Sequence, residues 1–159
     1  MILKNRGMYL ETLLNTWCKT LDKSIGYICK MNVNYKPLDI TNNIITGIIQ
    51  SNHFCDYIGI LSKHYIEFDA KETEKDYFDL ANIKKHQDEK LRIIDNLGGI
   101  AFIIVYFHKY DQFFLFQPFK YTFQTKKVSY EWFKEYGIEV IFEDLELNLL
   151  PSIYKLLIS

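Results

Sequence analysis

Two stretches of the chain repeat apolar residues at helical spacing. A stripe running from Leu10 to Leu21 predicts a helix over Met8 to Lys23. A second stripe of leucines and isoleucines predicts a helix over Asp79 to Asn96, with Asp79 as its N-cap and Gly98-Gly99 as its end. The chain therefore contains at least two amphipathic helices that can cover a sheet.

Strand-like patterns lie between and after these helices. Apolar residues at most alternate positions predict a strand over Tyr27 to Val33. Ile100 to Phe107 is almost continuously apolar, as expected of a central strand buried on both faces, and Gln112 to Phe116 suits an antiparallel partner. Helices and strands together predict an α/β fold, a mixed central sheet flanked by helices, in a single domain over residues 1–159.

The interval from Tyr35 to Ser51 fits neither pattern well. Pro37 interrupts it, and Asp39 or Thr41 could cap a helix. Isoleucines at positions 44, 45, 48 and 49 form two pairs at helical spacing, which favours a helix here.

The C-terminal part gives weaker signals. Phe119 to Tyr136 predicts two short helices, the second capped by Ser129. Glu139 to Leu150 mixes acidic and apolar residues irregularly, so a strand or a loop fits, and Pro151 can start a final short helix or an edge strand.

A β-hairpin over Asp56 to Thr73 brings charged residues into the sheet. Two apolar-rich strands flank the polar turn Ser62-Lys63-His64, and we expect a register that places Asp56 opposite Lys71. Because side chains alternate along a strand, Asp56, Asp69 and Lys71 then share one face. The other face is apolar and carries Tyr57, Gly59, Leu61, Ile66, Phe68 and Ala70.

Two carboxylates and an amine on one face suit phosphodiester hydrolysis. Asp56 and Asp69 can bind a hard divalent cation such as Mg²⁺ through oxygen. The ammonium of Lys71 can position a water molecule or neutralise developing negative charge. The alternative is a solvated strand face with an incidental cross-strand ion pair, because Asp-x-Lys is common on exposed strands.

Seven ordered blocks of the sequence point to a known family. The blocks are Asn5-Arg6-Gly7-Met8 with Leu10-Glu11; Asp56-Tyr57-x-Gly59; Phe68-x-Ala70-Lys71-Glu72-Thr73; Phe78-x-Leu80-x-Asn82; His86-Gln87; Gly98-Gly99-Ile100; and Phe102-x-Ile104. In these blocks the chain resembles the RecU family of Holliday junction resolvases, from its start to about residue 107, with a fainter echo in Pro151 to Leu157.

The resemblance implies a fold and an activity. The fold would be restriction-endonuclease-like, with a protruding stalk at about residues 36–53, between the first two strands, that enters the DNA junction. The activity would be Mg²⁺-dependent, symmetric nicking of four-way DNA junctions in recombination and repair. Junction symmetry favours a homodimer, and a recombinase is a further candidate partner.

Two polar residues on the predicted helices are candidate site residues. Glu11 stands in the family's Leu-Glu motif and is expected to assist catalysis by Asp56, Asp69 and Lys71; otherwise it is a rim glutamate paired with Lys4 or Lys19. Gln87 lies in the middle of an inward apolar stripe, so its amide must find partners. It either bonds to backbone or contacts the metal, its water or Lys71, and the His-Gln motif favours a role as a metal ligand.

Charge is distributed unevenly along the chain. The net charge is −1, yet residues 1–36 hold six Lys/Arg against two Asp/Glu, a net +4. Lys4 and Arg6 are therefore candidate phosphate contacts, and His86 is a further candidate DNA contact. Ordinary variation of surface charge would explain the same excess.

Two features depart from the family pattern. Phe54 stands where the family has a threonine, and the expected stalk has no Lys or Arg between Leu38 and Ser62. Phe54 would lower Mg²⁺ affinity and favour Mn²⁺, and His53 and Cys55 beside it are softer potential ligands. Both departures keep an alternative open: a non-catalytic junction-binding or recombinase-regulating protein that retains the nuclease fold.

Composition excludes several other classes of protein. Three cysteines, an odd number without a Cys-x-x-Cys motif, are typical of a reduced cytoplasmic protein and argue against cysteine-ligated zinc. No apolar segment is long enough to span a membrane, and the first seven residues contain no hydrophobic signal region.

Overall fold

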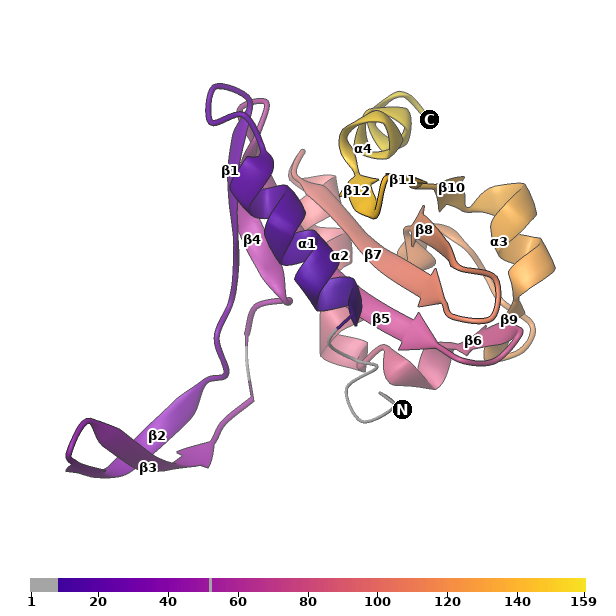
Figure 1. Cartoon of the computed structure of the whole chain (residues 1–159). Helices are drawn as coiled ribbons and strands as arrows, with labels where there is room; N and C mark the ends of the chain where they lie inside the picture. The colour runs from indigo at the N-terminus through magenta and orange to yellow at the C-terminus, as the bar shows by residue number, and fades with distance from the viewer. Residues whose placement is uncertain (1–8, 52) are drawn as a thin grey trace.

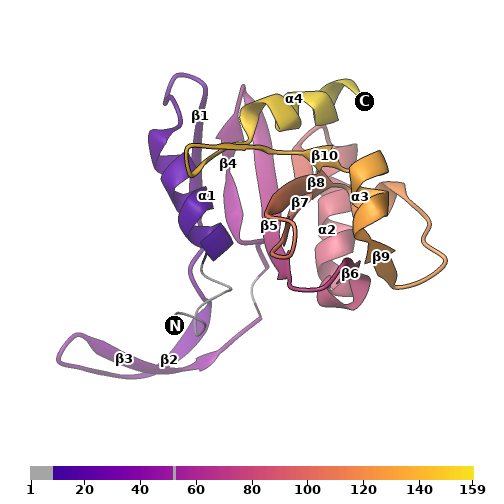
Figure 2. The same ribbon diagram turned by 45° about the vertical axis from the view of Figure 1, so that its right-hand side comes forward.

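The computed structural model describes residues 9–51 and 53–159, which form a central sheet with helices packed against both faces (Figure 1, Figure 2). The strands of this sheet are β1 (Gly26–Lys30), β4 (Tyr57–Leu61), β5 (His64–Thr73), β7 (Ile100–Phe107), β8 (Gln112–Phe116) and β10 (Ile138–Glu139), in the order β1-β4-β5-β7-β8-β10. β5 and β7 pair in parallel, whereas the other neighbouring pairs are antiparallel. The mixed central sheet flanked by helices that the sequence predicts is confirmed.

β7 is the centre of the hydrophobic core. All of its residues are buried, as its continuous apolar sequence predicts. Its alternate side chains enter two separate apolar clusters, one on each face of the sheet. Ile100, Phe102, Ile104 and Tyr106 join the first cluster, and Ala101, Ile103, Val105 and Phe107 join the second.

Each cluster is closed by its own helices. α1 (Tyr9–Thr20) and α4 (Leu150–Ile158) cover the first face, so Pro151 starts a helix and not an edge strand. α2 (Lys85–Asn96) and α3 (Tyr130–Tyr136) cover the second face, and Ser129 caps α3 by accepting from the Trp132 N–H at 3.1 Å, as predicted. None of the helices in the described part of the chain is both long and apolar enough to cross a lipid bilayer.

The prediction of one helix over Asp79 to Asn96 is wrong at its start. Asp79 caps only a short 3₁₀ turn, η2 (Leu80–Asn82), and α2 begins at Lys85. Ile83 and Lys84 between them have extended backbones, so the helical apolar pattern runs across a break in the helix.

Shorter elements complete the chain: β6 (Tyr77–Asp79), which pairs with β9 (Lys127–Ser129), η3 (Pro118–Lys120), and the hairpin of β11 (Ile141–Glu143) and β12 (Glu146–Asn148).

The predicted register of the β4–β5 hairpin is also wrong. Its turn has two residues, Ser62 and Lys63, with φ of 49° and 70°, the left-handed conformation of tight hairpin turns. Leu61 pairs with His64 and Tyr57 with Phe68, and continuing this register puts Asp56 opposite Asp69 and not opposite Lys71. Because the error is two residues, the alternation of faces is unchanged and the three charged residues still share one face.

The interval between β1 and β4 forms a second hairpin, which we call the stalk, made of β2 (Tyr35–Thr41) and β3 (Ile44–Ile49). The helix favoured by the isoleucine spacing is wrong. Asn42 and Asn43 have φ of 50° and 62° and form the turn, while β-branched isoleucines suit strands. The stalk protrudes from the sheet (Figure 1), and every residue of both strands is exposed.

Candidate active site at the start of β4 and in β5

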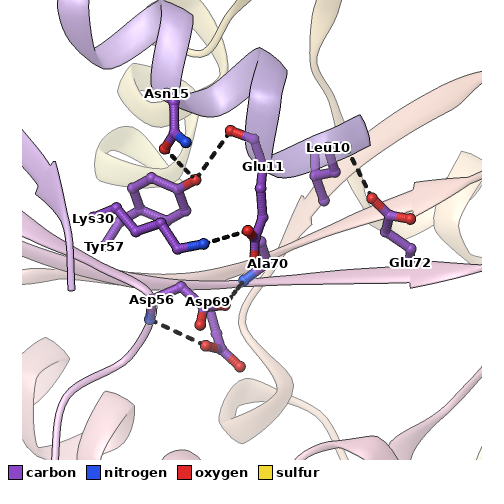
Figure 3. A network of polar contacts seen from close by, with 9 residues as sticks. All are labelled: Leu10, Glu11, Asn15, Lys30, Asp56, Tyr57, Asp69, Ala70 and Glu72. Carbon is purple, nitrogen blue, oxygen red and sulfur yellow. Dashed lines mark hydrogen bonds and ion pairs between the residues drawn. The ribbon is translucent and has the colours of Figure 1, made fainter. Parts of the chain in front are cut away.

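Asp56 and Asp69 bond to each other's strands where the β4–β5 ladder ends. The Asp56 N–H donates to Oδ1 of Asp69 at 3.2 Å, and the Ala70 N–H donates to Oδ2 of Asp56 at 2.9 Å (Figure 3). Side-chain carboxylates thus take the place of the backbone carbonyls that would continue the β4–β5 ladder. These two hydrogen bonds hold both carboxylates against the same short piece of the sheet.

Lys71 and Gln87 converge on Asp69, which is only 2% exposed. Lys71 Nζ lies 2.8 Å from Oδ2 of Asp69, and Gln87 Nε2 donates to the same oxygen at 3.1 Å. The amide oxygen of Gln87 accepts from the Lys84 N–H at 3.0 Å and closes the first turn of α2. The structure therefore brings together Asp56, Asp69, Lys71 and Gln87, with Gln87 bonded to a carboxylate and to the helix start.

Burial and the neighbouring Asp69 carboxylate perturb the ionisation of Asp56. The pKa of the Asp56 carboxyl is raised to about 7, first by burial and then by the hydrogen bond and negative charge of Asp69. The Ala70 N–H and the charge of Lys71 lower the pKa of Asp56, but they offset only part of this rise. Two carboxylates in a partly desolvated position resist simultaneous ionisation, and a bound cation would relieve that resistance.

Glu11 lies on α1, which packs on the opposite face of the sheet from Asp69. Its carboxylate forms an ion pair with Lys30 at the end of β1 (Figure 3), a partner that the sequence did not suggest. Within the described part of the chain, no hydrogen bond or ion pair joins its side chain to Asp56, Asp69 or Lys71.

Polar contacts tie α1, which carries Glu11, to the strands of the site (Figure 3). The Tyr57 hydroxyl donates to Oδ1 of Asn15 at 2.9 Å and lies 3.3 Å from the Glu11 carbonyl. The Leu10 N–H donates to a Glu72 carboxylate oxygen at 2.9 Å, which satisfies a free donor in the first turn of the helix. The helix position is therefore fixed relative to β4 and β5.

The candidate DNA contacts are less well defined. His86 lies exposed on the first turn of α2, one residue before Gln87. Lys4 and Arg6 lie outside the described residues.

A divalent metal fits the donors at this site only as a water-rich complex. The described residues include no cluster of three or more His, Cys, Asp or Glu side chains that could hold a metal ion. Mg²⁺, however, is usually held by one or two carboxylates while water and substrate phosphate fill its remaining positions, so Asp56 and Asp69 suffice for it. Burial raises the pKa of the Cys55 thiol, which keeps it protonated, and His53 is exposed, so neither softer donor is prepared as a ligand.

Two residues that the sequence did not assign to the site, Glu67 and Lys90, lie beside it. Glu67 is fully buried and forms an ion pair at 2.7 Å with Lys90, and the ring of Phe54 lies over the same ammonium, with Nζ 4.2 Å from the ring centroid. Glu67 is two residues before Asp69 on the same face of β5, and Lys90 is three residues after Gln87 on α2. A charged residue at an inward-facing strand position was the signal that could have identified Glu67.

Comparison with known proteins identifies the family. The sequence profile of RecU, described as recombination protein U, matches residues 5–155. The chain belongs to the RecU family. This match covers every candidate site residue except Lys4.

Relatives of known name agree with this assignment. A Holliday junction resolvase RecU of Ureaplasma parvum is 32% identical over 143 residues, which cover 86% of this chain and 84% of the relative. The Holliday junction resolvase RecU of Staphylococcus carnosus is 32% identical over 173 residues, 97% of this chain and 82% of the relative. Among solved structures, Archaeoglobus fulgidus Hjc, a Holliday junction resolvase, aligns over 84% of this chain and 93% of its own, with 11% identity and a TM-score of 0.48.

Proposed function

We propose that this RecU family member is a divalent-metal-dependent endonuclease that resolves four-way DNA junctions by nicking two opposed strands symmetrically. The observation that carries the proposal is the convergence of Asp56, Asp69 and Lys71 on one face of the hairpin. Membership of a family whose named relatives are Holliday junction resolvases supports the choice of substrate. We treat residues 1–159 as one nuclease domain that carries the stalk.

Asp56 and Asp69 would hold the metal ion, with Mg²⁺ as the first candidate and Mn²⁺ as the alternative. A divalent cation supplies Lewis-acid polarisation of phosphate oxygens and a more acidic water molecule. Asp69 is held by Lys71 and Gln87, and Asp56 by the Ala70 N–H, so both carboxylates keep their positions before any ion arrives. Gln87 acts on the ion through Asp69 or through water, because its amide oxygen already accepts from Lys84.

Lys71 is the proposed catalytic cation. Its side chain is partly exposed, at 22%, while its partner Asp69 is buried, so we place the substrate phosphate on the solvent side of the ammonium. There it can stabilise negative charge that develops on the phosphate oxygens. Glu11 is the proposed accessory carboxylate, and it would have to exchange Lys30 for a new partner when DNA binds.

The substrate suggests how the protein assembles. A four-way junction has approximate two-fold symmetry, so two active sites related by a two-fold axis would nick it symmetrically, and we propose a homodimer. Lys4, Arg6 and His86 are the proposed phosphate contacts, and a recombinase is a further proposed partner.

Cleavage of a synthetic four-way junction, with a linear duplex of the same sequence as control, tests this function across a series of Mg²⁺ and Mn²⁺ concentrations. Paired nicks at symmetric positions in the junction, with the linear duplex left intact, are expected. One observation favours a second candidate, a non-catalytic junction-binding protein. Residues 38–62, which include most of the stalk, contain no Lys or Arg. Junction binding without cleavage in either metal would select that candidate.

A further inference from the structure

Glu67 is a fully buried carboxylate with three hydrogen-bond partners. Oε1 accepts from the Cys55 N–H at 2.7 Å and lies 2.7 Å from Nζ of Lys90. Oε2 accepts from the Tyr65 hydroxyl at 2.6 Å. The side chain is therefore fully paired, and two of its three partners lie outside its own strand.

Lys90 links Glu67 to the backbone of the segment that leads into the site. From α2, its ammonium pairs with Glu67, donates to the carbonyl of His53 and lies under the ring of Phe54. Lys90 thus holds the chain at His53, which lies three residues before Asp56 and between the stalk and β4.

On the β5 side, residues 53–56 are held by these side chains, while on the β1 side the Asp56 carbonyl accepts from the Met31 N–H at 2.7 Å. Backbone pairing between β4 and β5 begins only at Tyr57 and Phe68. Before that point the Cys55 N–H bonds to Glu67 and the Asp56 N–H bonds to Asp69. Two carboxylates on one face of β5 therefore receive two successive amides, and α2 supports them through Lys90 and Gln87 respectively.

We propose that Glu67 and Lys90 are positioning residues for the nuclease reaction, which set the backbone of residues 53–56 and thereby the Asp56 carboxylate. The inference rests on the proposed function. Neither residue touches the substrate or the reacting atoms in this role.

Stability alone is a weak reason for this ion pair, because Glu67 is fully buried and its desolvation offsets much of its attraction to Lys90, whose side chain is 28% exposed. Well-packed apolar residues of similar volume can stabilise such a position equally well. An ion pair does, however, provide directed hydrogen bonds to backbone groups, which apolar residues cannot. Glu67 and Lys90 both form such hydrogen bonds with the segment before Asp56.

A double variant, Glu67→Met with Lys90→Met, separates positioning from stability. It replaces the pair by apolar side chains of similar length but leaves the buried Cys55 N–H without its acceptor, so the melting temperature is expected to fall by several degrees while the protein still folds. Tyr65→Phe is the matched control, because it removes the contact to the other oxygen of Glu67 and leaves the Cys55 and Lys90 contacts in place. Should the double variant not fold, Glu67→Gln with Lys90→Met removes both charges, leaves an amide oxygen for the Cys55 N–H, and tests the Lys90 contact to the segment by the same readouts.

The first readout uses metal-free protein. Amide hydrogen exchange of residues 53–56 should be about tenfold faster or more in the double variant, as for the loss of a hydrogen bond to a charged group. Exchange in β7 reports any global loss of stability and should rise less than exchange at residues 53–56, and Tyr65→Phe should match the wild type. Unchanged exchange of residues 53–56 in the double variant would overturn the proposal.

The second readout is the Mn²⁺ concentration that gives half-maximal junction cleavage. It should rise about tenfold in the double variant, the usual scale for the loss of a group that orients a metal ligand. Junction affinity measured in Ca²⁺ should remain within about threefold, since no phosphate contact is removed. A wild-type protein that cleaves no junction would refute the proposed function, and the exchange measurement would still decide the role of the pair.

Discussion

Replacing Lys71 by methionine tests the proposed chemistry most directly. The variant keeps the length of the side chain and removes the ammonium that lies 2.8 Å from Oδ2 of Asp69. Asp69 is left with the Gln87 amide and the Asp56 N–H as partners, so its carboxylate remains hydrogen-bonded. The site should therefore keep its shape and lose one positive charge.

The expected loss of rate can be estimated from that charge. An ammonium about 4 Å from a developing unit charge contributes about 4 kcal/mol at an effective dielectric constant of about 20. This energy corresponds to about 10³ in rate, and because the charge develops only in part, we expect the rate constant to fall about 10² to 10³-fold. The affinity for the junction should change by less than about threefold, since one lysine is a small part of the phosphate contacts.

Single-turnover cleavage of a four-way junction measures the rate, and gel-shift titration in Ca²⁺ measures the affinity. Lys134→Met on α3 is the matched control, because it removes the same charge at a position that contacts Tyr130 and lies outside the site. If Lys71→Met weakens binding and cleavage by the same factor, Lys71 is a DNA anchor and the assigned chemical role is wrong.

Three further changes test other parts of the argument. Asp69→Asn should abolish cleavage in both metals and leave junction binding within about threefold, because it removes a proposed metal ligand and no proposed DNA contact; cleavage near the wild-type rate would exclude Asp69 as a ligand. Phe54→Thr should raise the ratio of Mg²⁺-dependent to Mn²⁺-dependent cleavage, since a hydroxyl supplies an oxygen donor that the phenyl ring lacks; an unchanged ratio in parallel metal titrations would mean that the ring, which lies over Lys90, does not line the metal position. Gly59→Ala should destabilise the fold by about 1–3 kcal/mol or more in urea unfolding, because an added Cβ would lie 2.1 Å from the backbone carbonyl oxygen of Tyr27 on β1; an unchanged midpoint would show that β1 and β4 can separate at no cost.

The grouping of the catalytic candidates was predictable from local sequence. Asp56, Asp69 and Lys71 share a face because side chains alternate along strands, and this holds for any register that differs by two residues. The partner of Asp56 was not predictable in the same way. A two-residue turn, Ser62 and Lys63, sets the register, and both residues have the left-handed conformation. Neither serine nor lysine is typical of such a turn, so the sequence did not predict its position.

The stalk shows a different limit of sequence patterns. Its isoleucines stand at a spacing compatible with a helix, but β-branched side chains and the Asn42-Asn43 turn favour a hairpin. Periodicity reports which face of an element is buried, and no residue of the stalk is buried, so periodicity carried no information there. Turn residues were the better signal.

The sequence by itself determined the class of the fold, the central strand, the face that bears the catalytic candidates and the family. These follow from alternation, apolar runs and ordered motifs, which depend on neighbours close along the chain. Only the tertiary structure decided which distant residues meet: Lys30 with Glu11, Gln87 with Asp69, and Lys90 with Glu67. Such pairs depend on how helices dock across a sheet, and packing over the whole core sets that geometry.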